Sequence, residues 1–208
     1  MKIVYNISAN HYLTRAIINV ARFTREEDIK FAFYAALELR NCIERVLFEY
    51  MWMLKESGLS KNDINSYKPD DFICKIEKFE PYFEQKIKFT EEVLKTVIGP
   101  EFNIALPDFN RLNKLYGKLG NYLHAAKTPE NQSAKIEWYE NLTHIVIDAK
   151  EYLVEILSSN RARIKEFTPE AMDLYHRYRN SYPNIEQDLL NEIAILFAPL
   201  PSNPQNPE

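Results

Sequence analysis

Glycine is scarce in this chain. Only four glycines occur among its 208 residues, and two of them, Gly117 and Gly120, lie three apart in a segment that otherwise has the pattern of a helix. Alternation of apolar and polar residues, the pattern of β-strands, is almost absent, and apolar residues recur at helical spacing instead. These features predict an all-α fold, a bundle of about six to eight helices.

Cysteine is scarce as well, and positive charge is not in excess. The two cysteines are expected to be reduced thiols of a cytoplasmic protein, because the cytosol keeps thiols reduced. The net charge of −4 argues against a surface built throughout for nucleic acid or anionic membrane, although a local basic patch is compatible with it. No phosphate-cradling glycine loop, His-Glu-x-x-His, Cys-x-x-Cys or Gly-x-Ser-x-Gly motif occurs, so no cofactor or metal is expected.

No membrane-spanning or secretory segment is expected. The most hydrophobic stretch, 31–54, contains five charged residues: Glu38, Arg40, Glu44, Arg45 and Glu49. Five charges are too costly for a helix that faces lipid. The first residues lack the apolar run of a signal peptide. The hydrophobic stretch 31–54 is therefore predicted to be a helix of the protein core.

Capping patterns predict where the helices begin. Thr24 and Glu27 have capping-box spacing and predict the start of a long, mostly buried central helix over 24–55. Asp108 is expected to cap the glycine-bearing helix, and Thr128 and Thr168, each followed by Pro and Glu, are expected to cap helices too. We expect one helical domain over 1–198 and a disordered, proline-rich tail over 199–208. Helices are predicted at about 9–22, 24–55, 70–79, 82–98, 108–126 and 134–160, with one or two more over 169–197.

The helical glycines belong to a stripe along one side of their helix. At about 100° per residue, four residues fall together: Asn113, Gly117, Gly120 and His124. A strip without side chains lets another backbone or a flat ligand approach closely. The strip is either a tight helix crossing with a polar edge, or a groove in which His124 transfers a proton or contacts phosphate.

The central helix offers a partner for this strip. Arg40 and Glu44 are four residues apart on an apolar face, and an unpaired buried charge is very costly. They are expected either to form an ion pair that braces the bundle, or to be arranged so that Arg40 points into the groove that holds His124. Glu38, on the opposite stripe with Arg45 and Glu49, is expected to be solvated.

A second basic region lies near the end of the chain. Tyrosines alternate there with His176, Arg177 and Arg179, and Tyr178 lies among them. Basic and aromatic residues together suit single-stranded RNA, because bases stack and phosphates pair with cations. Cations near a helix C-terminus are also ordinary complements of the helix dipole, so both interpretations stay open.

The segments FYAALELRNCIERVLFEY and LYGKLGNYLHA resemble the HEPN (higher eukaryotes and prokaryotes nucleotide-binding) superfamily of helical proteins, over about 24–126. In nuclease members, an arginine precedes a histidine by four to six residues, and two copies cut RNA without metal. The resemblance implies His124 as the histidine. The arginine is missing: Lys118 stands at the nearest cationic position, without the planar two-pronged contact of arginine, and Asn121 takes the place of a polar motif residue.

Two alternative functions are therefore considered for this chain. In the first, a cytoplasmic protein of a bacterial defence or stress system binds RNA or cuts it without metal, with His124 helped by Lys118, Asn121 and Arg40. In the second, a non-catalytic interaction module forms a homodimer through the face that carries Gly117 and Gly120.

Overall fold

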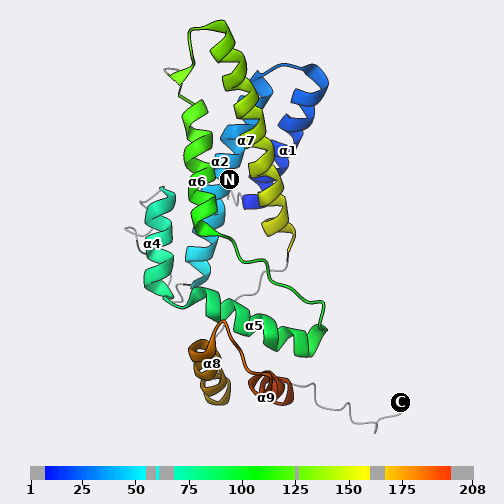
Figure 1. The fold of residues 1–208 in the computed structure, drawn as a ribbon, viewed down its shortest axis with the longest axis vertical. Coiled ribbons are helices and arrows are strands. Elements are labelled where there is room, and N and C mark those ends of the chain that lie inside the picture. The colour runs from blue at the N-terminus through cyan, green and yellow to red at the C-terminus, as the bar shows by residue number, and fades with distance from the viewer. Residues whose placement is uncertain (1–7, 55–59, 61–67, 125–126, 160–166, 198–208) are drawn as a thin grey trace, which may run out of the picture. The chain divides into compact units, whose positions relative to one another are not determined.

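The chain is all-α. The computed structural model describes residues 8–54, 60, 68–124, 127–159 and 167–197, and within these ranges it contains eight helices and no strand. The prediction of an all-α bundle is confirmed. None of the described helices combines the length and the apolar character needed to cross a membrane. The helices are α1 (Ala9–Glu26), α2 (Lys30–Leu54), α4 (Pro69–Phe79), α5 (Phe83–Ile98), α6 (Phe109–Tyr122), α7 (Gln132–Ser158), α8 (Pro169–Ser181) and α9 (Gln187–Phe197) (Figure 1).

The helices form two compact units. The first covers 1–81 and 107–159 and holds α1, α2, α4, α6 and α7, whereas the second covers 82–106 and 160–208 and holds α5, α8 and α9. In the first unit α2 contacts each of the other four helices, and α6 lies beside α7 (Figure 1). The long, mostly buried central helix is thus α2. The single domain over 1–198 stays a prediction, and the predicted tail over 199–208 lies outside the described residues.

The predicted start of the central helix is wrong. Helix α1 continues through Thr24, whose hydroxyl donates a hydrogen bond to the carbonyl oxygen of Val20 (3.2 Å) instead of capping a new helix. The chain turns at Glu27, which has a left-handed backbone (φ 52°). Asp28 then accepts a hydrogen bond from the amide of Lys30 (3.0 Å) at the start of α2. A threonine hydroxyl can bond back to the preceding turn as well as cap the next one, so spacing alone did not decide between them.

Of the other three predicted caps, two are confirmed. The carboxylate of Asp108 accepts a hydrogen bond from the backbone amide of Arg111 (3.0 Å). The hydroxyl of Thr168 accepts one from the backbone amide of Ala171 (3.3 Å). The prediction for Thr128 is wrong, because α7 begins at Gln132 and is capped by Asn131. Asparagine caps as well as threonine does, and here it lies next to the first helical turn.

The charges expected to be solvated on α2 instead hold α1 in place. Glu38 is only 7% exposed and pairs with Arg15 of α1, with 2.8 Å between Nη2 and Oε1. Glu49 accepts hydrogen bonds from the amide of Ala9 (3.0 Å) and from Nε of Arg45 (3.2 Å). The sequence pattern divides α2 into an apolar side and a polar side, and only the apolar side was expected to be covered. In the structure α1, α6 and α7 all contact α2, so its polar side is partly covered as well.

Aromatic rings fill the core of the second unit. Phe89 of α5 is fully buried, and its ring centroid lies 5.2 Å from that of Phe167, 5.6 Å from that of Tyr175 and 5.5 Å from that of Tyr178. Packed aromatic rings of this kind contribute through their large buried area and their edge-to-face geometry. Phe89 is therefore the centre of this core.

A buried carboxylate fixes the chain after α5. Glu91 is 4% exposed and accepts hydrogen bonds from Lys88 and from the backbone amide of Ile104, both at 3.2 Å, while Lys95 lies 2.9 Å away. Burial alone would raise the pKa of Glu91, but the hydrogen bonds from Lys95, Ile104 and Lys88 outweigh it and lower the pKa below its ordinary value. The ionised carboxylate of Glu91 thus holds the backbone of Ile104 against α5.

Candidate functional site

Gly120 is paired with Arg40 of the same chain. A Cβ atom built on Gly120 would lie 3.6 Å from both Cζ and Nη1 of Arg40, which are its nearest atoms outside the adjoining residues and backbone of α6. The flat guanidinium therefore occupies the space beside the glycine, where a larger side chain would extend. The close neighbour of Gly120 is thus a cation on α2 that leaves room for a Cβ atom but not for a larger side chain.

The hydroxyl of Tyr116 bridges the two predicted partners on α2. Arg40 donates from Nη2 to the Tyr116 oxygen (2.6 Å), and Tyr116 donates to Glu44 (2.7 Å). The guanidinium carbon also lies 4.2 Å from the centre of the Tyr116 ring. Burial, followed by the hydrogen bond to Glu44, raises the pKa of Tyr116, so the phenol stays protonated and can donate. This network braces α2 against α6 through the Tyr116 hydroxyl, which takes the place of the direct Arg40–Glu44 ion pair that the sequence predicted.

The other three residues of the stripe do not share the surroundings of Gly120. Gly117 is exposed, and a Cβ atom there would meet nothing within 4 Å in the part of the chain that the structure describes. Asn113 donates to Asp70 of α4 (2.5 Å), and His124 is exposed in the turn after α6, which ends at Tyr122. The four residues therefore do not line one groove in the described chain. Arg40 and His124 belong to different surroundings, Arg40 to the brace between α2 and α6 and His124 to the solvent.

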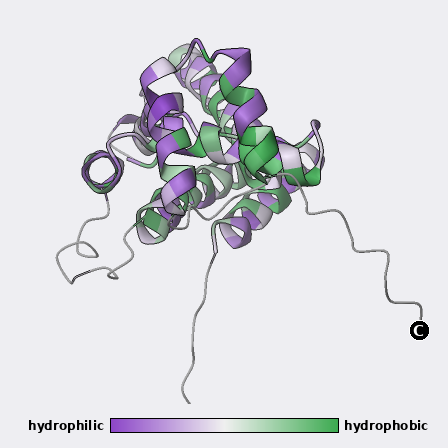
Figure 2. Ribbon diagram, turned by 90° about the horizontal axis from the view of Figure 1, so that it is seen from below, coloured by the Kyte–Doolittle hydropathy of each residue, from purple (hydrophilic) through white to green (hydrophobic). Residues whose placement is uncertain are grey.

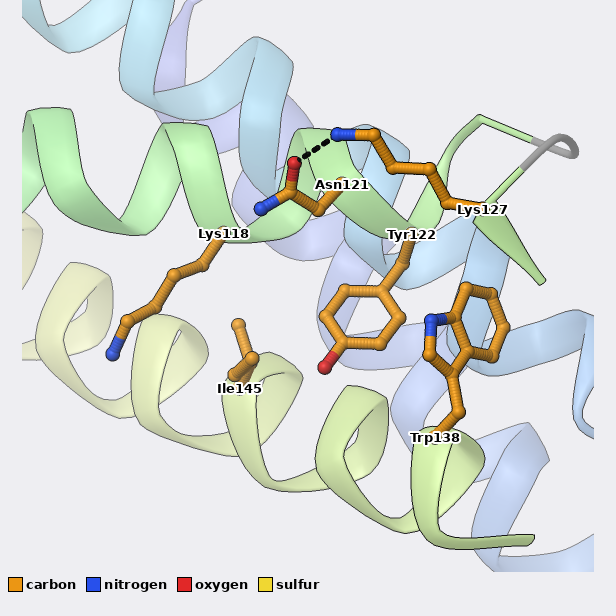
Figure 3. Close-up of a pocket in the computed structure, with 6 residues that line it drawn as sticks. All are labelled: Lys118, Asn121, Tyr122, Lys127, Trp138 and Ile145. Carbon is orange, nitrogen blue, oxygen red and sulfur yellow. Dashed lines mark hydrogen bonds between the residues drawn. The ribbon is translucent and has the colours of Figure 1, made fainter. Parts of the chain in front are cut away.

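A pocket of about 430 Å³ lies instead on another side of α6, between α6 and α7 (Figure 3). Its lining brings together two lysines, an amide, two aromatic rings and one aliphatic side chain. These residues are Lys118, Asn121, Tyr122, Lys127, Trp138 and Ile145. Its size is within the usual range for small-molecule sites, roughly 300–1,000 Å³. We call it the α6–α7 pocket.

The aromatic wall of this pocket is held by its neighbours. Tyr122 and Trp138 lie with ring centroids 4.8 Å apart and a tilt of 51°. Behind them, Phe33 of α2 and Tyr139 of α7 lie 5.8 Å and 5.4 Å from the Trp138 ring. Burial raises the pKa of Tyr122, so its hydroxyl remains a neutral donor. A ring packed in this way gives a stacking ligand a fixed surface.

The polar wall of the pocket carries positive charge. Lys118 extends from α6, while Lys127 comes from the connection to α7 and donates to the amide oxygen of Asn121 (Figure 3). That bond leaves the amide NH₂ of Asn121 as the group it can offer to a ligand. Among the described residues, no carboxylate lines this pocket. Two ammonium groups and an amide donor beside an aromatic wall suit an anion that also has a flat ring.

The structure unites only part of the predicted site. Lys118 and Asn121 line the pocket together, and His124 lies just beyond it, where its carbonyl oxygen accepts from the amide of Lys127 (2.9 Å). The sequence did not identify Tyr122, Lys127 or Trp138. The aromatic residues clustered around Trp138 could have indicated a binding surface. Predicting that Trp138 packs against Tyr122, however, requires knowing that α6 and α7 form a hairpin.

The basic and aromatic region of α8 has other partners. Arg177 makes two hydrogen bonds to Glu192 of α9 (2.5 and 2.8 Å), and the guanidinium of Arg179 lies 4.3 Å from the centre of the Tyr82 ring. Tyr178 is buried against Phe89, and His176 is exposed. RNA contact by these four residues of α8 stays a prediction.

Neither a metal cluster nor a known relative identifies the ligand of this chain. Within the described ranges, no group of three or more His, Cys, Asp or Glu side chains gathers as a metal ion would need. No family model, curated protein or solved structure matches the chain. The HEPN resemblance therefore rests on the residues alone, and the ligand of the α6–α7 pocket is inferred from the side chains that line it.

Proposed function

We propose that this chain is a HEPN-like cytoplasmic protein that binds single-stranded RNA at the α6–α7 pocket. One observation carries the proposal: two lysines and an aromatic wall converge on one pocket of suitable size. Single-stranded RNA supplies the complement to both, since its bases stack on aromatic rings and its phosphates pair with cations. The net charge of −4 confines the attraction to such a local patch.

Binding is better supported than cleavage. General acid–base cleavage needs a histidine together with a cation that stabilises the charged phosphorane. His124 is exposed beside the pocket, but Arg40 already contacts Tyr116 and Gly120 on another side of α6. Within one chain, Lys118 and Lys127 are then the cations at hand for His124. Cleavage remains an extension of the RNA-binding proposal, part of a role in bacterial defence or stress.

Charge removal in the pocket gives the direct test. In fluorescence anisotropy with a labelled RNA of about 12 nucleotides, a length within the usual site sizes, the double variant Lys118→Gln/Lys127→Gln should bind at least about tenfold more weakly at low salt. The slope of log K against log salt, which is negative, should become shallower by about 1.4, because each phosphate contact to a single strand contributes about −0.7.

The matched control is Lys78→Gln, an exposed lysine on α4 in the same unit. It should leave both affinity and salt slope unchanged. RNA recovered from the wild-type samples is run on a gel beside RNA exposed to His124→Ala, without metal, to detect cleavage. If wild type fails to bind at low salt, or if Lys78→Gln weakens binding as much as the double variant does, the proposal is wrong.

Self-association through Gly117 is the second candidate function, the non-catalytic module. A glycine in a helix interior costs roughly 1 kcal/mol relative to alanine, and nothing in the described chain fills the space beside Gly117. A second helix packed there would explain it. Light scattering should then show a dimer for wild type and a monomer for Gly117→Leu, whereas a monomeric wild type at high concentration excludes this function.

A further inference from the structure

A second pocket, of about 510 Å³, lies between α8 and α9, within the second unit. Its lining combines apolar side chains with carboxylates: Leu174, Ile195 and Leu196 with Glu170, Asp173 and Glu192. We call it the acidic groove. It shares no lining residue with the α6–α7 pocket, so a role for it is independent of the RNA proposal.

The apolar part of the acidic groove is unusually open to solvent. Ile195 is 79% exposed and Leu196 is 44% exposed, while Leu174 beneath them is buried. In Figure 2, α9 is drawn mostly green where it meets the C-terminal trace, as its composition of leucine, isoleucine and phenylalanine requires. Adjacent exposed apolar side chains rimmed by polar ones mark interaction sites more often than single exposed ones do.

The charges on the rim decide which partner fits. Glu170 and Asp173 are exposed on α8, and Glu192 is held in place by its two hydrogen bonds to Arg177. Three carboxylates against one guanidinium leave the groove negative. An anionic membrane or an acidic peptide would be repelled, whereas lysines or arginines at the edge of an apolar anchor would be attracted.

The chain's own last residues do not supply that complement. Residues 198–208 contain one acidic side chain, Glu208, and no lysine or arginine. The apolar side chains of the groove come from two helices in contact, α8 and α9, and a groove of this kind can accept the apolar face of a third helix. The carboxylates and the apolar side chains therefore select the same class of partner.

We infer that the acidic groove between α8 and α9 docks a basic amphipathic helix of another protein. Leucine-like anchors of that helix cover Ile195 and Leu196, and its cations lie against Glu170 and Asp173. This assigns the second unit an interaction surface separate from the α6–α7 pocket.

A designed peptide tests this on the whole 208-residue chain. The probe is a labelled peptide of about 14 residues with leucines on one helical face and lysines on the other. The matched control peptide carries glutamate at each lysine position. Wild type should bind the lysine peptide in the micromolar range, more weakly as salt rises, and should not bind the glutamate peptide.

Substitutions test whether the lysine peptide binds at the acidic groove. Ile195→Asp should weaken binding at least about tenfold, and because Ile195 is 79% exposed the fold should be unaffected. Glu170→Gln/Asp173→Asn should weaken binding and flatten its salt dependence. Val97→Asp, at a 52% exposed position on α5 outside the groove, is the control and should behave as wild type.

Several results would overturn the inference. These are equal binding of the two peptides, no binding of the lysine peptide, or an equal effect of Ile195→Asp and Val97→Asp. Binding only to vesicles of phosphatidylcholine and phosphatidylserine would assign the apolar side chains to a lipid surface instead. A wild-type dimer that Ile195→Asp converts to a monomer would assign them to a second copy of the chain.

Discussion

Gly120→Leu should lower the free energy of unfolding by about 2 kcal/mol or more. Its Cβ alone would make an ordinary contact with the guanidinium of Arg40 at 3.6 Å, but the branched end of leucine needs the space that the guanidinium fills. Displacing Arg40 breaks its bond to Tyr116 and leaves a partly buried cation without that partner. Urea unfolding followed by tryptophan fluorescence measures the change, since both tryptophans, Trp52 and Trp138, lie in the first unit.

Two matched variants separate this effect from general intolerance of the helix. Gly120→Ala keeps the ordinary contact with Arg40 and gains helix propensity, so stability should be unchanged or up to about 1 kcal/mol higher. Gly117→Leu points into open space and should also be tolerated, when measured at a dilution at which light scattering shows a monomer. Equal destabilisation by both leucine variants would contradict the packing of Arg40 against Gly120.

Phe89→Ala is expected to destabilise the second unit by about 3–5 kcal/mol. The ring is fully buried and contacts Phe167, Tyr175 and Tyr178, so its removal leaves a cavity at the centre of a small core. The far-ultraviolet circular dichroism of the variant should therefore show part of the helix signal lost at lower urea than in wild type.

The two tryptophans make this result specific. Because Trp52 and Trp138 both lie in the first unit, the midpoint of the fluorescence transition should not change in Phe89→Ala. Val97→Ala, at an exposed position on the same helix, should change neither signal. If fluorescence and circular dichroism shift together, the two units unfold as one, and the single domain predicted over 1–198 would be the better description.

The sequence was sufficient where the physics is local. Helical periodicity predicted the helices, because one face of each is apolar, and the side chains of Asp108 and Thr168 cap as expected because a cap involves only neighbouring residues. Spacing failed where two local solutions compete, as at Thr24 and Thr128, since a hydroxyl can bond backward or another residue can cap.

The predicted site was divided by packing. A helical wheel placed Gly120 and His124 on one stripe, but α2 packs against only part of that stripe. Arg40 is engaged in the brace to Tyr116, and Lys118 and Asn121 line a pocket with residues of α7 far along the chain. A wheel gives angles within one helix and carries no information about which neighbour covers each angle.

The sequence by itself determined that this protein is helical, which helix is central and where two caps lie, because those properties follow from backbone propensity and from the period of the apolar residues. Only the tertiary structure decided that Glu38 is buried, that a guanidinium fills the space beside Gly120, and that Tyr122 and Trp138 line one pocket together with two lysines. These features depend on contacts between residues distant in the chain, whose geometry is fixed when helices pack and not before.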